Sequence, residues 1–139
     1  MARKKTTFKM LSYGVHSHWD KSSKELPKLK KFTWKIPARL NIEFGYVLNI
    51  KQARGKKLEF IIDHPDFIDE KTGDTAAPFR GEMYIRSNDW DFFLGDTLWS
   101  PIEDKVGTWT LTTKLEGETL VQKRFTITED QGQFSDWDI

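Results

Sequence analysis

The sequence lacks several features that common functional classes require. None of its 139 residues is a cysteine, which excludes disulfides, zinc–thiolate sites and cysteine nucleophiles. The absence also favours a reducing compartment, so we predict a cytoplasmic protein, unless an export signal has been removed. The charged N-terminus is not followed by the apolar segment of a signal peptide. Because the longest apolar run, Phe60–Ile62, is far too short to cross a bilayer, we expect no membrane partner.

Motifs for catalysis and cofactor binding are missing as well. The sequence has no Gly-x-Ser-x-Gly nucleophile motif, only three histidines, and no glycine-rich run that would cradle a phosphate. Two carboxylates for glycoside cleavage are present in any acid-rich chain, but nothing here selects a particular pair. We therefore predict that the protein is not an enzyme and that it holds no cofactor.

Two segments resemble metal sites only weakly. His16 and His18 would lie on the same side of a strand, but a third ligand would have to come from Asp20 or from the distant His64. The loop Asp63–Asp74 is rich in oxygen ligands, although its spacing differs from that of an EF-hand loop. We expect polar surface at both places and predict no metal site; the sequence leaves open whether the acidic loop binds a cation.

The clearest positive signal is the stretch Val106–Thr128, which predicts a β-hairpin. Apolar and polar residues alternate along its first half with the period of a half-buried strand. One face of that strand carries Trp109, Leu111, Thr113 and Leu115. Gly117 provides the tight turn, and the β-branched and aromatic segment Leu120–Thr128 returns as the second strand. We expect Trp109 to be the buried anchor of this hairpin.

Similar alternation along the rest of the chain predicts about eight strands and no helix. Before the hairpin, strands are predicted at Thr6–Val15, Phe32–Ile36, Asn41–Lys51, Leu58–Ile62, Gly81–Arg86 and Asp89–Leu94. This pattern favours an all-β, antiparallel, two-sheet sandwich, with a small barrel as the alternative. The length fits a single domain over residues 1–139, with a core at about 6–128 and an acidic tail at 129–139.

The inward faces of these strands predict the hydrophobic core. Its expected members are Phe8, Met10, Trp34, Ile36, Ile42, Phe44, Tyr46, Leu48, Phe60, Ile62, Trp109, Leu111, Phe125 and Ile127.

Several short motifs, taken in order, carry a resemblance to a known family. They are the Ser-Tyr-Gly-Val strand at 12–15, Ile36-Pro37-Ala38, Phe44-Gly45, Pro65, the aromatic segment 90–94, Gly107-Thr108-Trp109, Gly117 and Phe125. With these motifs the chain resembles the bacterial domain of unknown function 3859 and, more loosely, immunoglobulin-type modules. The resemblance implies an immunoglobulin-like β-sandwich without an established activity, and it supplies no functional residues.

Charge is distributed unevenly between the two halves of the chain. Residues 1–57 contain 15 Lys and Arg against 3 Asp and Glu, whereas residues 58–139 contain 7 against 18. Opposite halves attract each other within a molecule or between two copies. Together with the missing catalytic motifs, this asymmetry favours a binding module that pairs with a protein partner or forms a homodimer. We expect the contact at an open sheet edge or at the aromatic tail.

Two other ligand classes remain as alternatives. Four tryptophans without an assigned core face are candidate ligand or partner residues, and as surface rings they would stack on a glycan: Trp19, Trp90, Trp99 and Trp137. The basic stretch Lys21–Lys35 interleaves lysines with aromatic residues, a pattern typical of single-stranded nucleic-acid binding. Nucleic acid is the weaker alternative because Phe32 and Trp34 alternate with polar residues and are expected to face the core.

Overall fold

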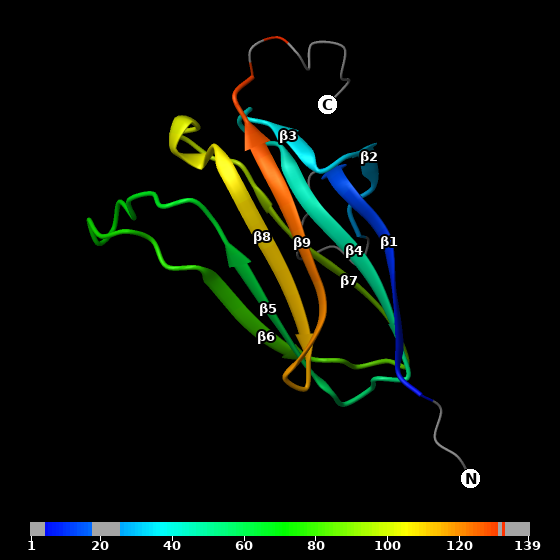
Figure 1. Cartoon of the computed structure of the whole chain (residues 1–139). Helices are drawn as coiled ribbons and strands as arrows, with labels where there is room; N and C mark the ends of the chain where they lie inside the picture. Colours follow the sequence, from blue (N-terminus) through cyan, green and yellow to red (C-terminus); the bar gives the residue numbers. More distant parts are fainter. Residues whose placement is uncertain (1–4, 18–25, 131, 133–139) are drawn as a thin grey trace.

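A computed structural model describes residues 5–17, 26–130 and 132, which form two β-sheets packed face to face (Figure 1). The four-stranded sheet has the order β2 (Leu29–Phe32), β1 (Thr7–His16), β4 (Glu43–Lys51) and β7 (Asp89–Thr97). The five-stranded sheet has the order β3 (Lys35–Pro37), β9 (Glu118–Thr128), β8 (Gly107–Leu115), β5 (Lys57–Asp63) and β6 (Phe79–Tyr84). A single 3₁₀ turn, η1 (Glu103–Lys105), precedes β8. The predicted two-sheet sandwich is confirmed, and the barrel alternative is wrong.

The hairpin of β8 and β9 forms as its sequence predicts. Glu116 and Gly117 both have positive φ angles, 49° and 83°, which gives the tight turn its left-handed backbone. Trp109 lies opposite Phe125 in the ladder and is fully buried. Its indole Nε1 donates a hydrogen bond to the carbonyl oxygen of Lys105, at 2.8 Å, so the one polar atom of the ring is satisfied.

The core lies between the two sheets and joins β4 to β8 and β9. The ring of Phe44 meets the rings of Trp109 and Phe125 edge-on, with centroids 5.3 Å and 5.5 Å apart. The hydroxyls of Tyr46 and Thr113 are 2.6 Å apart and form a buried hydrogen bond between the sheets. Burial raises the pKa of the Tyr46 phenol, and the bond to Thr113 only partly opposes this.

The prediction of a single strand at Phe32–Ile36 is wrong. The chain bends after Phe32, where Thr33 exchanges hydrogen bonds with the backbone of Lys35, and it crosses from one sheet to the other. The segment is thus two strands, β2 and β3, and the sandwich has nine strands rather than eight. Because the bend breaks the alternation, Trp34 does not share the core face of Ile36, and its side chain is 47% exposed.

Phe8 is the other member of the predicted core list that the structure places at the surface. It lies opposite the buried Ile50, so it is on the inner face of its sheet, yet it is 46% exposed. In the described residues β2 pairs with β1 only at Gly14–His16, which leaves the Phe8 end of β1 at the rim of the sandwich. Met10 and Phe60 are partly buried, and the other ten predicted core residues are buried.

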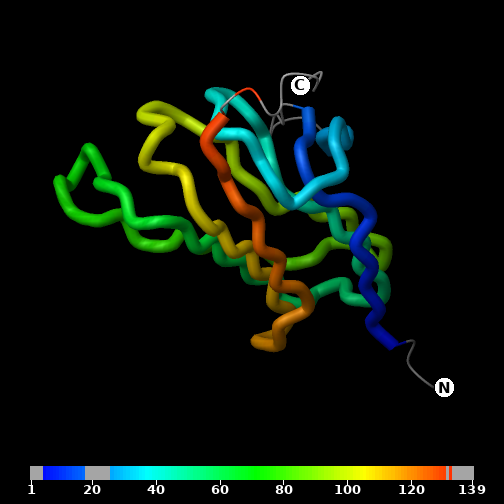
Figure 2. The backbone as a smooth tube through the Cα atoms, turned by 45° about the horizontal axis from the view of Figure 1, so that its top comes forward, coloured from blue at the N-terminus to red at the C-terminus, as the bar shows by residue number. Residues whose placement is uncertain are grey.

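The two sheets end in four edge strands, of which β6 and β7 define one open side of the sandwich. Beyond this side the segment 64–78, green in Figure 2, extends away from the body of the domain. It is folded back on itself by a bridge between Ile68 and Thr75 and ends where β6 begins.

Candidate binding groove

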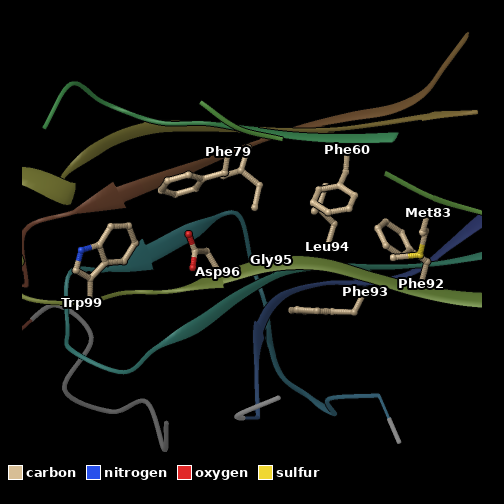
Figure 3. A pocket seen from close by; sticks show the side chains of 10 residues that line it. Phe60, Phe79, Met83, Phe92, Phe93, Leu94, Gly95, Asp96 and Trp99 are labelled. Atoms are coloured by element: carbon tan, nitrogen blue, oxygen red, sulfur yellow. The ribbon is translucent and has the colours of Figure 1, made fainter. Parts of the chain in front are cut away.

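A groove runs along the open side between β6 and β7. It has a volume of about 480 Å³ and is lined almost entirely by apolar side chains (Figure 3). The lining residues are Phe60 and Ile62 of β5, Phe79 and Met83 of β6, Phe92, Phe93, Leu94, Gly95 and Asp96 of β7, and Trp99 after it. Because each of the two sheets ends here, their inward-facing apolar residues are not covered by a further strand.

Local sequence explains why the groove stays open. Gly81 of β6 lies opposite Phe60 of β5, and a Cβ atom at residue 81 would overlap the Phe60 ring. The missing side chain leaves room for that ring, which packs against Phe92 of the facing sheet at a tilt of 42°, with centroids 5.9 Å apart. Asp96 is the one charged residue in the lining. The groove therefore suits apolar side chains.

At one end of the groove, Trp99 and Phe79 separate it from a second hollow of about 430 Å³. Their ring centroids lie 6.1 Å apart. Trp99 also meets Phe67 and the buried Trp109 edge-on, at 5.4 Å and 6.2 Å. The aromatic cluster thus connects the wall of the groove directly to the anchor of the core.

Lys105 places a positive charge inside this aromatic cluster. Its side chain is buried, and its Nζ donates to the carbonyl oxygen of Pro101 at 2.8 Å and pairs with Asp104. The same Nζ lies 4.6 Å from the Trp99 ring centroid and 4.7 Å from that of Phe67, within the range of cation–π attraction. The ammonium is therefore satisfied by the protein itself and serves to position the two rings.

His64 attaches the protruding segment to the same cluster. The imidazole is buried and stacks on Phe67, with ring centroids 4.3 Å apart. Its Nδ1 lies 2.9 Å from the carbonyl oxygen of Pro65, and its Nε2 lies 2.9 Å from that of Ala77. Because a carbonyl oxygen only accepts, both contacts are hydrogen bonds at once only when both ring nitrogens carry a proton.

The strand that borders the groove, β7, is an unusually regular edge. It pairs with β4 over all nine residues, from Thr97 opposite Glu43 to Asp89 opposite Lys51, without a bulge. It contains no proline and no lysine, two residues that commonly protect exposed edges. Its acidic side chains Asp89 and Asp91 both accept hydrogen bonds from Nδ2 of Asn49, at 2.6 Å and 2.8 Å. Among the described residues β7 is the last strand of the four-stranded sheet.

The opposite side of the sandwich, where β1 and β9 extend beyond the short edge strands β2 and β3, is built differently. β1 has a bulge between Met10 and Ser12, and β9 has one opposite the Thr113–Lys114 step of β8. Lysine side chains cover aromatic rings here. Lys123 Nζ lies 3.9 Å from the Tyr13 ring centroid, and Tyr13 contacts Phe32 at 4.1 Å.

The four tryptophans predicted as ligand residues do not form one surface. Trp99 lines the groove, whereas Trp90 lies near the other end of β7, roughly 30 Å away at the rise of an extended strand. Trp90 is partly buried, and its indole Nε1 has no hydrogen-bond partner among the described residues. Trp19 and Trp137 lie outside the described residues. Binding of a glycan by Trp90 or Trp99 stays a prediction.

Sequence reasoning did not assign Phe79, Met83 and Phe92 to a groove. Their alternation on β6 and β7 marks an inner face, but it does not reveal that both strands end their sheets. The Gly-Glu-Met-Tyr segment offered one usable signal, because a glycine inside a strand often marks a close approach of another side chain.

The weak metal-site candidates have other roles or lie outside the described residues. His16 is buried, with its Nδ1 3.0 Å from the carbonyl oxygen of Gly14 and its Nε2 3.0 Å from Oγ of Ser12. Burial lowers the pKa of His16, and the bond to Gly14 partly offsets this. His18 and Asp20 are not described. Within the described ranges, no three His, Asp or Glu side chains gather as metal ligands, and no helix is long and apolar enough to span a membrane.

Comparison with known proteins identifies the family of this chain. A family model described as a domain of unknown function, DUF3859, matches residues 4–127, so the chain belongs to that family. The fold is similar to that of an immunoglobulin-like protein from Pseudomonas aeruginosa, with a TM-score of 0.72 and 17% sequence identity. The match covers 92% of this chain and 100% of that one. No curated protein matches the sequence. Both the predicted family and the predicted immunoglobulin-like sandwich are confirmed.

Proposed function

We propose that this protein is a non-enzymatic interaction module that binds an extended peptide segment along β7. The observation that carries the proposal is a regular nine-residue edge strand beside an apolar groove. An added strand gains backbone hydrogen bonds from the edge, and its alternate side chains enter the groove. Affinity then comes from the backbone, and specificity comes from the groove.

The lining of the groove defines which peptide fits. Alternate residues of a strand point to the same face, so every second side chain of the ligand would meet Phe92 or Leu94. Asp89 and Asp91, on the other face of β7, favour lysine or arginine at the remaining positions. The preferred ligand is therefore an extended segment in which apolar and basic residues alternate.

A fluorescent hexapeptide that alternates lysine and valine tests this proposal with the full chain. We expect saturable binding by fluorescence polarisation, and slower amide hydrogen exchange in β7 when the peptide is present. A glutamate–valine peptide should bind at least tenfold more weakly, because it opposes the aspartates. A lysine–serine peptide should bind weakly, because it leaves the groove empty.

Two substitutions on β6 provide the matched pair. Met83→Lys places a charge in the groove and should weaken the lysine–valine peptide at least tenfold, whereas Tyr84→Lys, on the 63%-exposed neighbour, should not. Equal binding by both variants, or unchanged exchange in β7, would show that the peptide does not use this groove.

A second candidate function, single-stranded nucleic-acid binding, is favoured by one correction to the sequence prediction. Phe32 and Trp34 were expected in the core, but they are 57% and 47% exposed, and Lys35 Nζ lies 5.3 Å from the Trp34 ring. Trp34 also lines a shallow hollow with Lys123 and Arg124. Exposed rings among lysines can stack on bases while the cations contact phosphates.

A labelled twelve-nucleotide poly-dT strand tests this second candidate. We expect salt-sensitive binding that Trp34→Ala weakens several-fold and that Trp34→Phe largely retains. Binding that is absent at low salt, or equal in both variants, would remove the nucleic-acid candidate without affecting the peptide proposal.

A further inference from the structure

The two edges of the four-stranded sheet carry opposite charge. At one edge, β7 contains Asp89, Asp91 and Asp96 and no basic residue. At the other edge, the four side chains of β2 are all exposed, and two of them are lysines. Lys28 directly precedes this strand, and residues 26–35 contain four lysines and no acid. The basic residues near this edge are Lys51 of β4, which lies opposite Asp89 in the ladder, and Arg86, in the connection before the strand begins.

We propose that the partner of β7 is β2 of a second copy of this chain, so that the four-stranded sheet continues from one molecule to the next. This inference rests on the proposed function and names its ligand. The segment Lys-Leu-Lys-Lys-Phe at 28–32 supplies basic residues for the aspartates of β7 and two apolar side chains, Leu29 and Phe32, although the adjacent Lys30 and Lys31 interrupt a strict alternation. Leu29 and Phe32 are 40% and 57% exposed, so both are available for apolar contact.

Strand direction fits this continuation. The pairs β2–β1, β1–β4 and β4–β7 are all antiparallel, so direction alternates across the sheet and β7 runs opposite to β2. When a second copy is added in the same orientation, its β2 runs opposite to the β7 that it meets. The new pair is therefore antiparallel, and the alternation continues without reversing the second molecule.

Charge disfavours the symmetric alternative, in which β7 of one copy pairs with β7 of another. That arrangement brings three aspartates of each copy into one contact without a lysine or arginine from either strand. Like charges that face each other across paired strands are destabilising. The β7–β2 contact instead sets aspartates against Lys28 and Lys30. It is heterologous, so repeated copies form a ring if the rotation closes and an open filament if it does not.

Sedimentation velocity on the full chain in 50 mM and 500 mM NaCl tests the assembly. We expect concentration-dependent association at low salt that weakens at least tenfold at high salt, because the contact relies on exposed charges. Two charge-reversal variants should each be monomeric, because each has like charges at both edges of its four-stranded sheet. In Lys28→Glu/Lys30→Glu both edges are acidic. In Asp89→Lys/Asp91→Lys the β7 edge becomes basic, like the β2 edge. Lys114→Glu/Arg124→Glu changes the net charge as much as the lysine pair does, on β8 and β9 of the other sheet, and should associate like the unmodified chain.

Mixing the two charge-reversed variants is the decisive experiment for the β7–β2 contact. The acidic β2 of one variant is complementary to the basic β7 of the other, so the mixture should associate although neither variant does alone. Thermal melts establish that each variant is folded. A monomeric wild-type chain at every concentration, or a mixture that stays monomeric, would overturn the β7–β2 contact.

The peptide experiment separates this inference from the proposed function. A monomeric chain that still binds the lysine–valine hexapeptide along β7 leaves the module intact and removes only self-assembly. A chain that neither associates nor binds the peptide contradicts both.

Discussion

The two open sides of this sandwich differ in whether their exposed strands are protected against pairing with another strand. Along β1 and β9 the ladders are interrupted by bulges, and lysines such as Lys123 lie over the exposed rings. Along β7 the ladder is uninterrupted, and the strand contains neither lysine nor proline. Bulges and lysines are the usual means by which proteins keep exposed edges from pairing. The lengths of β1 and β9 are thus protected against strand addition, whereas β7 offers a template for it.

The groove side is also the side on which the aromatic cluster around Trp109, the anchor of the core, reaches the surface. Trp109 contacts Trp99, which lines the groove, and the His64–Phe67 pair holds the protruding segment against the same rings. On the protected side Trp34 stands at the surface, with Lys35 over its ring. A perturbation of the groove side should therefore affect stability and binding together, whereas one on the protected side should not.

The largest expected effect compares the same substitution at two tryptophans. Trp109→Ala removes a fully buried ring and its hydrogen bond to Lys105, and it should lower the free energy of unfolding by about 3–5 kcal/mol. Trp34→Ala, at a half-exposed ring, should change it by no more than about 0.5 kcal/mol. Urea unfolding followed by circular dichroism measures both. Similar losses in the two variants would contradict the contrast between the two sides.

An intermediate effect is expected at Gly95 of β7. A Cβ atom there would overlap the backbone oxygen of Phe44 on β4, and also the ring of Phe93. Because backbone cannot move aside as a side chain does, Gly95→Ala should cost about 1–3 kcal/mol and separate β7 from β4. Gly81→Ala is the control, since its new methyl group meets only the Phe60 side chain. Thermal melting and hydrogen exchange in β7 should show the larger change for Gly95→Ala.

The smallest expected effect concerns pH and His16 on the protected side. Burial lowers the pKa of His16 below its unfolded value of about 6.5, so the unfolded chain takes up a proton that the native chain does not. The free energy of unfolding should therefore fall as the pH drops below about 6.5. Denaturant midpoints between pH 7.5 and pH 5 measure this slope. His16→Gln should flatten it, and an unchanged slope would assign the acid sensitivity to other groups.

Much of the fold is predictable from period-2 alternation, because a strand with one buried face repeats apolar residues at every second position. The hairpin around Trp109 and the strand at Asn41–Lys51 are correct for this reason. The same rule is wrong for Trp34, because the turn at Thr33 resets the alternation between two short strands. The rule is also insufficient for Phe8. It gives the inward direction of that side chain correctly, but no neighbouring strand among the described residues buries it.

The sequence by itself determined the class of this protein: an all-β sandwich, its family, and a core anchored by Trp109. Only the tertiary structure decided which strands end the sheets, and hence where a groove and an unprotected edge lie. Alternation reports the direction of a side chain relative to its own strand, which is a local property. The cover that a residue receives depends on strands distant in the chain, such as β5 and β6 opposite β7. The charge asymmetry is visible in the sequence, but its division between the two edges of one sheet follows from strand order alone.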